Sequence, residues 1–205
     1  MRLIAVALLA AVAFAEPHIF YSKSFPGSAP AYVEITLEKS GEGVYKEAPD
    51  DEQPLKFKLG QKAVSEIFTL AEKLGHFSRL LESGLPVAKM GEKTFRWVDG
   101  GKNSEQKYNY STDPDAQALQ NWFEKMTETE QHVIALERTI RFDKLGVNKA
   151  LLQMQAAIER DRLVALDQFL PWLDRVAKND SYLNMARERA ASLADAIRAT
   201  KAGVE

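Results

Sequence analysis

The sequence predicts an α+β fold: a small antiparallel sheet covered on one face by helices, followed by a C-terminal helical bundle. Two observations support this prediction. In several short segments before residue 110, hydrophobic residues alternate with polar ones, which is the pattern of half-buried strands. After residue 145, hydrophobic residues recur only at helical spacing. Because the two patterns are separated along the chain, we expect an α+β sheet domain over 16–126 and a helical domain over 127–205.

The first fifteen residues have the pattern of a secretory signal peptide, expected over 1–15. Arg2 supplies a short positive region, residues 3–13 are apolar, and Ala13-Phe14-Ala15 matches a small-x-small cleavage site. The apolar run is shorter than the roughly 20 residues that span a bilayer, so cleavage after Ala15 is favoured over a retained anchor. We therefore expect an exported protein, periplasmic or secreted, with no stable membrane insertion after cleavage.

The composition narrows the classes of function. Of the 205 residues, 45% are hydrophobic and 27% are charged, which is ordinary for a folded soluble protein. The formal net charge of −2 argues against a nucleic-acid partner, since dedicated nucleic-acid binders usually carry a basic excess. The sequence contains no cysteine, which excludes disulfides and thiol chemistry, so packing alone must stabilise the fold.

Strand patterns dominate the first part of the chain. Residues 16–30 are rich in Pro, Gly and Ser and are expected to form a loop or an edge segment. Residues 31–38 alternate cleanly, a turn follows, and VYKEA is expected to return as a second strand. Residues 55–59 alternate again. The spacing then becomes helical over 61–74, which predicts the first helix.

A second hairpin and a long helix are expected next. Residues 93–112, KTFRWVDGGKNSEQKYNYST, indicate two strands joined by a long flexible turn over DGGKNSEQ. A helix is expected from Asp113 onward, with Pro114 in its first turn. Its apolar stripe is interrupted by TETEQ and then resumes, so this helix is expected to connect the two domains. Three later stripes predict the bundle, and Pro171 is expected to kink a helix or start a new one.

The aromatic rings of the second hairpin allow two interpretations: an exposed platform for a base or a sugar, or part of the core. By alternation, Phe95 and Trp97 share one side of their strand, and Tyr108 and Tyr110 share one side of the next. Exposing these rings would bury Arg96, and an unpaired buried charge costs roughly several kcal/mol, whereas burying an aromatic side chain gains about 1.5–3 kcal/mol. The core interpretation is therefore favoured, with Arg96 in water. KTFRWV also lacks the glycine expected of an RNA-recognition sheet.

The opposite, open face of the sheet is the best candidate for a binding site. It is expected to present a set of mixed charge: Glu34, Lys56, Lys58, Arg96, Lys107 and Asn109. The alternative is an ordinary solvated face with cross-strand ion pairs, each worth at most about 1 kcal/mol.

Motifs of catalysis and metal binding are missing from the sequence. The histidines, His18, His76 and His132, are not at metal-ligand spacing from one another. Glu128 and His132 could share a helix face, and a solvated surface pair is expected. No nucleophile elbow and no Gly-rich phosphate loop occur. The sequence therefore identifies no catalytic, cofactor-binding or metal-binding residue, and an enzyme is the less favoured class.

One stretch resembles a known group of proteins. SAPAYVEITLEKSGEGVYKE, followed by LKFKL and a helix, resembles an uncharacterised family of exported bacterial α/β domains. In that family, a strand pair with a glycine-containing turn precedes a helix and a second hairpin. The resemblance covers roughly residues 21–126. It implies export and a small α/β layer, and it implies no activity.

Three hypotheses of function follow. The favoured one is a non-enzymatic exported protein that binds another macromolecule, such as an envelope protein, through the helical domain or the open sheet face. The second is an envelope hydrolase whose site is not visible in one sequence. The third is a carrier that holds a small ligand between sheet and helices. An exposed apolar strip over residues 183–197 would favour a protein partner, and a cavity beneath the sheet would favour the carrier.

Overall fold

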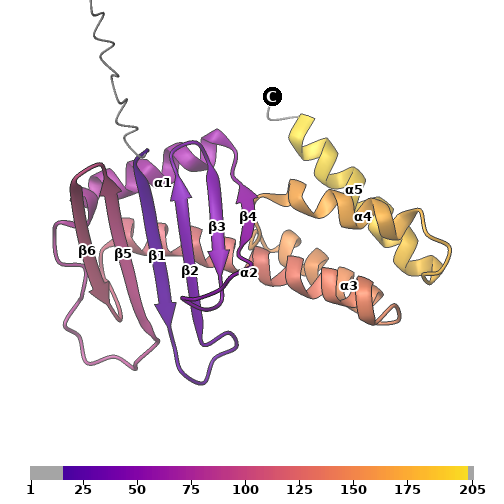
Figure 1. The fold of residues 1–205 in the computed structure, drawn as a ribbon, viewed down its shortest axis with the longest axis horizontal. Coiled ribbons are helices and arrows are strands. Elements are labelled where there is room, and N and C mark those ends of the chain that lie inside the picture. The colour runs from indigo at the N-terminus through magenta and orange to yellow at the C-terminus, as the bar shows by residue number, and fades with distance from the viewer. Residues whose placement is uncertain (1–15, 203–205) are drawn as a thin grey trace, which may run out of the picture.

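The computed structural model describes residues 16–202 and has two parts connected by one long helix (Figure 1). A six-stranded antiparallel sheet forms the first part, and a bundle of helices forms the second. The predicted α+β fold with C-terminal helices is therefore confirmed. The predicted signal peptide, residues 1–15, lies outside the described residues. Within residues 16–202, no helix is both long enough and apolar enough to cross a membrane.

The sheet has the strand order β4-β3-β2-β1-β5-β6, and every neighbouring pair is antiparallel. The strands are β1 (His18–Ser24), β2 (Tyr32–Glu38), β3 (Glu42–Lys46), β4 (Leu55–Lys58), β5 (Glu92–Asp99) and β6 (Lys102–Tyr108). Because β1 pairs with β2 on one side and with β5 on the other, the first strand in the chain lies in the middle of the sheet.

The central position of β1 corrects the prediction that residues 16–30 form a loop or an edge segment. Only the residues between β1 and β2 are rich in Pro, Gly and Ser. Within β1, Ile19 and Tyr21 are fully buried on the inner face, while Phe20 lies on the opposite face and is partly exposed. Because Phe20 is an apolar residue on the outer face, apolar and polar residues do not alternate cleanly along β1, and the strand pattern was not recognisable in the sequence.

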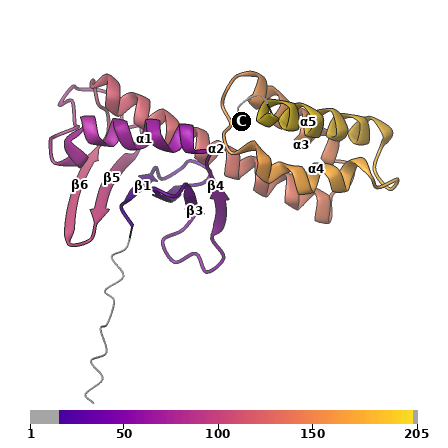
Figure 2. The same ribbon diagram turned by 90° about the horizontal axis from the view of Figure 1, so that it is seen from above.

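Two helices cover the inner face of the sheet, α1 (Gln61–Lys73) and α2 (Pro114–Phe142), and no helix of the described chain covers the other face (Figure 2). The predicted helix over 61–74 is thus present. At the centre of this core, the rings of Tyr21, Phe95 and Phe123 meet with centroid separations between 5.0 and 5.4 Å. Three buried aromatic side chains from β1, β5 and α2 therefore join the sheet to its covering helix.

The hairpin of β5 and β6 largely follows the core interpretation. Phe95 is fully buried, and the Arg96 side chain is 41% exposed on the open face. Trp97 is only partly buried, because it lies where the η1 turn (Gly75–Phe77) meets the sheet; its ring packs 4.3 Å from the His76 ring and 5.7 Å from the Phe68 ring. The rings of Phe95, Trp97 and Tyr108 therefore pack on the core and form no outward platform.

Two details of this hairpin differ from the prediction. β5 and β6 remain paired up to Asp99 and Lys102, so the turn consists of Gly100 and Gly101 alone, with a φ of 56° at Gly100. The expected long flexible turn is wrong because a polar edge strand satisfies its backbone by pairing even without an apolar face. Tyr110, expected in the core, is 38% exposed because β6 ends at Tyr108 and the alternation no longer holds.

The helix α2 runs for 29 residues without a break. Its start is capped by Asp113, whose side chain accepts hydrogen bonds from the backbone N–H of Asp115 (2.9 Å) and Ala116 (3.3 Å). The polar TETEQ segment does not interrupt it; instead Thr129 and Glu130 within that segment are buried. Residues of α2 up to Met126 pack in the sheet core, and those from Val133 onward pack in the helical core. We call the region between them the joint.

The second part packs α3 (Val147–Glu159), α4 (Leu170–Ala177) and α5 (Asn184–Ala202) around the end of α2, with a short turn η2 (Leu166–Phe169) before α4. Pro171 lies in the first turn of α4, so the predicted new helix start is confirmed. The apolar residues of α5 face this core and are buried: Ala186, Ala190, Leu193 and Ile197. The exposed strip that would favour a protein partner is therefore not present over most of residues 183–197.

Candidate functional site

The open face of the sheet carries charges that pair with one another. Its ion pairs are Glu34–Lys46 at 3.4 Å, Lys58–Glu42 at 2.7 Å, Arg96–Glu105 at 2.6 Å and Lys107–Glu92 at 3.9 Å. The Arg96 guanidinium also lies 4.5 Å from the centre of the Phe20 ring. Four of the six residues expected to bind a partner thus already have partners on the protein.

The two remaining candidates lie apart from those pairs. Lys56 is exposed on β4, opposite Val44. Asn109 follows the end of β6 and is turned away from the face, since its side chain accepts from the Met90 N–H (2.8 Å) and donates to the Ala88 carbonyl (3.0 Å). The predicted set is therefore spread over several strands and a loop, and it does not converge on one point.

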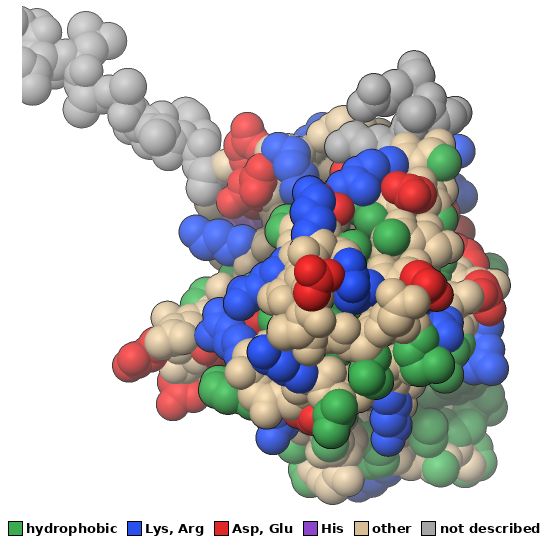
Figure 3. Space-filling view, turned by 90° about the vertical axis from the view of Figure 1, so that its right-hand side faces the viewer, with side chains coloured by type: hydrophobic (Ala, Val, Ile, Leu, Met, Phe, Trp, Pro, Cys, Tyr) green, Lys and Arg blue, Asp and Glu red, His purple; other side chains and the backbone are tan. Residues whose placement is uncertain are grey.

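The far end of the helical bundle exposes several hydrophobic side chains: Phe142, Leu145, Leu183 and Met185. Figure 3 shows that charged side chains of both signs are interspersed with hydrophobic ones on this side of the molecule. Scattered apolar residues of this kind are normal on protein surfaces and do not by themselves indicate a site.

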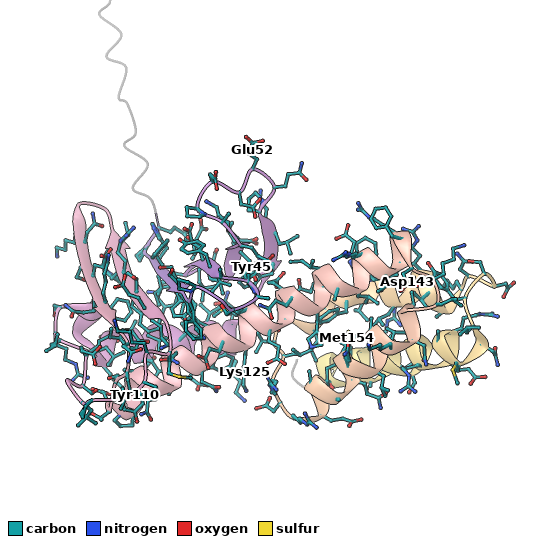
Figure 4. All side chains as sticks on the ribbon, turned by 90° about the horizontal axis from the view of Figure 1, so that it is seen from below. Tyr45, Glu52, Tyr110, Lys125, Asp143 and Met154 are labelled. Atoms are coloured by element: carbon teal, nitrogen blue, oxygen red, sulfur yellow. The ribbon has the colours of Figure 1, made fainter. Side chains whose placement is uncertain are left out.

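A pocket of about 520 Å³ lies at the joint, where β1 and β2 meet α2 and α3. Figure 4 shows from below how α2, with Lys125, continues from the sheet toward the helices around Met154 of α3. We call this pocket the joint pocket. The polar side chains that matter in its lining are Tyr21, Lys23, Glu124, Glu128, His132 and Arg162.

The Tyr21 hydroxyl is a buried donor without a partner on the protein. Among the described residues, only two buried side-chain atoms make no hydrogen bond on the protein: Tyr21 Oη, in the wall of the joint pocket, and Glu130 Oε2, at the joint itself. Burial, with a contribution from the carboxylate of Glu124, raises the pKa of Tyr21 far above its ordinary value, so the hydroxyl stays protonated. An unpaired buried hydroxyl costs about 1–3 kcal/mol. Because this oxygen has almost no accessible surface, a ligand acceptor would reach it only after the side chains around it shift, and it would then recover that free energy.

Lys23 lies two residues further along the same face of β1. It sits between Val33 of β2 and Lys93 of β5, and within residues 16–202 its ammonium makes no ion pair or hydrogen bond. The neighbouring Lys93 is occupied, because its Nζ donates to the Asn109 carbonyl at 2.8 Å. Burial, and secondarily the charge of Lys23, lowers the pKa of Lys93. Lys23 is therefore the cation that the joint pocket offers to a ligand.

The opposite wall is built by an ion pair. Arg162 Nη2 lies 2.6 Å from one Glu128 oxygen, and His132 Nε2 lies 3.9 Å from the other. The expected pair of Glu128 and His132 is present, but its side chains are only 22% and 19% exposed, because the segment after α3 brings Arg162 against them. Burial is the main cause that lowers the pKa of His132, which is therefore neutral at pH 7.

Glu124 completes the lining next to Tyr21. Its Oε1 accepts from Gln120 Nε2 at 2.8 Å, and Gln120 Oε1 in turn accepts from the Tyr108 hydroxyl at 3.2 Å. With His132 neutral, Lys23 and Arg162 balance Glu124 and Glu128 in charge. The pocket therefore has one unpaired cation beside one unpaired donor, within surroundings that contain two carboxylates.

Sequence reasoning did not identify Tyr21, Lys23, Glu124 or Arg162. These residues come from β1, α2 and the segment after α3, so only the fold brings them together. One signal was available in HIFYSKS, where Tyr21 and Lys23 follow Ile19 at alternate positions and so continue its buried face with polar groups.

Comparisons with known proteins do not indicate a function, so a proposal must start from the geometry of the structure. No protein-family model matches the chain, and no curated protein matches it. Across residues 16–202, no three His, Asp or Glu side chains are grouped so as to hold a metal ion. The resemblance to exported bacterial domains remains a prediction.

Proposed function

We propose that this chain is a non-enzymatic binding protein that holds a ligand in the joint pocket, with an anionic group of the ligand on Tyr21 and Lys23. One observation carries the proposal: a buried hydroxyl without a partner lies on the same strand face as an unpaired ammonium. Proteins rarely leave buried donors unmet unless water, an ion or a ligand completes them. Once the side chains that cover Tyr21 Oη shift, a carboxylate oxygen would accept from both groups and form a charge-assisted hydrogen bond with Lys23.

The lining favours a ligand with a single negative charge. Glu124 and Glu128 would repel a dianion such as a phosphate monoester, and Arg162 is already paired with Glu128.

Catalysis in the joint pocket is less well supported than binding. Thr127, the hydroxyl of the pocket next to Glu128, donates to the Phe123 carbonyl at 2.9 Å and is not activated by His132.

A macromolecular partner on the open sheet face is less well supported than the pocket. The charges there are already paired across strands, and exposed pairs of this kind contribute little to stability and leave few unmet groups for a partner. Export to the periplasm or beyond remains part of the proposal, since it depends on residues 1–15.

Ligand-observed NMR would test the proposal. The mature protein would be screened against N-acetylalanine, the same compound as its amide, glucose and glucose 6-phosphate. We expect a signal from the free carboxylate alone, and its loss in Lys23→Met and in Tyr21→Phe. Two variants serve as matched controls, Lys39→Met at an exposed lysine and Tyr110→Phe at an exposed tyrosine. Equal binding of the acid and the amide, or binding that survives in both pocket variants, would overturn it.

A further inference from the structure

The joint pocket continues past the Glu128–Arg162 ion pair. A second hollow of about 350 Å³ lies on the other side, and the two hollows share Glu124, Glu128 and Arg162. The second hollow is also lined by Asn121, Lys125, Arg160 and Asp161. The two hollows are therefore adjacent, and the ion pair forms a bridge of side chains that both of them border.

Together the hollows follow one side of α2. Their α2 residues run from Asn121 in the second hollow to Ala135 in the first, which is about 21 Å of helix at 1.5 Å per residue. A chain in extended conformation rises about 3.3 Å per residue, so about six residues of a peptide would span the two hollows, which together we call the groove. A lone small acid would occupy only the part next to Lys23.

We infer that the ligand is the C-terminal end of an extended peptide: its free carboxylate lies on Tyr21 and Lys23, and the preceding residues cross the Glu128–Arg162 bridge into the second hollow. This inference rests on the proposed function and names its ligand class. A C-terminus supplies one negative charge and a series of amides, and the groove offers matching chemistry for both.

The charges of the groove agree with a monoanionic peptide end. Four cations, Lys23, Lys125, Arg160 and Arg162, face three carboxylates, Glu124, Glu128 and Asp161, which leaves a single positive charge. Two of the cations are already paired, since Lys125 and Arg162 each lie 2.6 Å from a carboxylate oxygen. A nucleic acid or another polyanion would meet three carboxylates, whereas one terminal carboxylate needs only Lys23.

Amide side chains line both hollows. Gln131 and Gln153 border the first and Asn121 borders the second, and each presents a carbonyl acceptor and an NH₂ donor. Side chains of this type pair with the N–H and C=O groups of a peptide backbone. They also favour an uncharged chain over one with acidic side chains, given the three carboxylates nearby.

Isothermal titration with two peptide lengths tests the inference. The probes are N-acetyl-Ala-Ala and a pool of N-acetylated hexapeptides that end in Ala-Ala, each as the free acid and as the C-terminal amide. We expect the hexapeptide acids to bind about tenfold or more tightly than the dipeptide acid, and amidation to remove binding of both. Asn121→Trp, at an exposed helix position, should fill the second hollow and weaken only the hexapeptides, whereas Lys149→Trp on α3 should change nothing.

The outcomes separate this inference from the proposed function. If the dipeptide acid binds through Lys23 and Tyr21 but the longer peptides gain nothing, the peptide inference is wrong and the carboxylate site stands. If neither acid binds, both are wrong. Binding of the amides as tightly as the acids would also overturn both, because Lys23 and Tyr21 would then have no role.

Discussion

The open face of the sheet and the joint are both rich in charge, but they differ in how their polar groups are paired. On the open face, Arg96 pairs with Glu105 and Lys58 pairs with Glu42 across neighbouring strands. At the joint and in the wall of its pocket, Glu130 Oε2 and Tyr21 Oη are buried without partners on the protein. Unmet hydrogen-bonding groups thus mark a candidate site better than the number of charges does, because paired exposed charges are an ordinary way to keep a sheet face in water.

The joint is held by the segment that follows α3. Val164 N–H donates to Thr129 Oγ1 and Gln168 Nε2 donates to Glu130 Oε1, both at 2.9 Å. Leu163 belongs to the helical core, while Val164 packs against the sheet core. This segment therefore connects the two cores over α2, and Arg162 at its start reaches the joint pocket.

The largest effect on stability is expected at Glu130. Burial raises the pKa of Glu130 to about 7, partly offset by the hydrogen bond from Gln168. The folded state therefore holds this proton more tightly than the unfolded state, so the stability it contributes is present below about pH 4.5 and is lost as the pH rises through 7. Glu130→Gln, which stays neutral, should be more stable than the native protein at pH 8.5 by up to about 3 kcal/mol and similar at pH 4.5.

Urea unfolding at both pH values measures the effect of Glu130→Gln. Glu105→Gln is the control from the open face, where it removes the partner of Arg96 and should cost less than about 1 kcal/mol. If Glu130→Gln had the same effect at both pH values, the buried Glu130 carboxyl would not resist ionisation. Only Tyr21 Oη would then distinguish the joint and its pocket from the open face.

The second-largest effect is expected on ligand affinity, which should depend on the joint pocket and not on the open face. Lys23→Met is expected to weaken binding of N-acetyl-Ala-Ala about tenfold or more, since it removes the only charge-assisted bond to the carboxylate. Reversing two charges on the open face, Arg96→Glu together with Lys58→Glu, should leave that affinity unchanged. Titration calorimetry on both variants decides the matter: a loss in the sheet double variant would move the site to the open face.

The two buried tyrosines next to Glu124 should respond with opposite sign. Tyr21→Phe removes an unpaired hydroxyl and should stabilise the ligand-free protein by about 1 kcal/mol. Tyr108→Phe removes a hydroxyl that donates to Gln120 at 3.2 Å and should destabilise it by a similar amount, about 1 kcal/mol. Thermal unfolding of both variants provides the measurement. Destabilisation by both would show that the Tyr21 hydroxyl already has an acceptor.

The smallest effects are expected from the open face itself. Glu42→Gln breaks the 2.7 Å pair with Lys58, and its cost should be less than about 1 kcal/mol at low salt. Because salt screens exposed charges, this cost should shrink further at about 1 M salt. An open-face pair whose loss cost several kcal/mol would contradict the contrast between this face and the joint.

Sequence patterns predicted the fold correctly where the hydrophobic residues of a segment followed a single spacing, that of a strand or that of a helix. The alternation in residues 31–38 and the helical spacing over 61–74 each matched an element, because each has one buried face. The pattern failed at β1, where Phe20 lies on the outer face, and at β6, which is polar throughout most of its length. Both strands are held by pairing with neighbours, which the local sequence does not encode.

The candidate site could not be predicted in the same way. Tyr21 and Arg162 are far apart in the sequence, and each is unremarkable alone. Whether a hydroxyl or an ammonium lacks a partner depends on the packed structure. Residue types alone therefore indicated the open face, where the charged side chains of the strands were expected. There, charges such as Arg96 and Lys58 were recognisable in the sequence, and their pairing across strands agrees with the alternative of an ordinary solvated face.

A crystal structure of the protein soaked with N-acetyl-Ala-Ala tests the central claim most directly. The joint pocket is predicted to hold the peptide with its carboxylate about 2.6–3.2 Å from both Tyr21 Oη and Lys23 Nζ. Density for the peptide on the open sheet face, or a pocket in which water alone satisfies Tyr21 while Lys23 pairs with Glu124, would contradict the account.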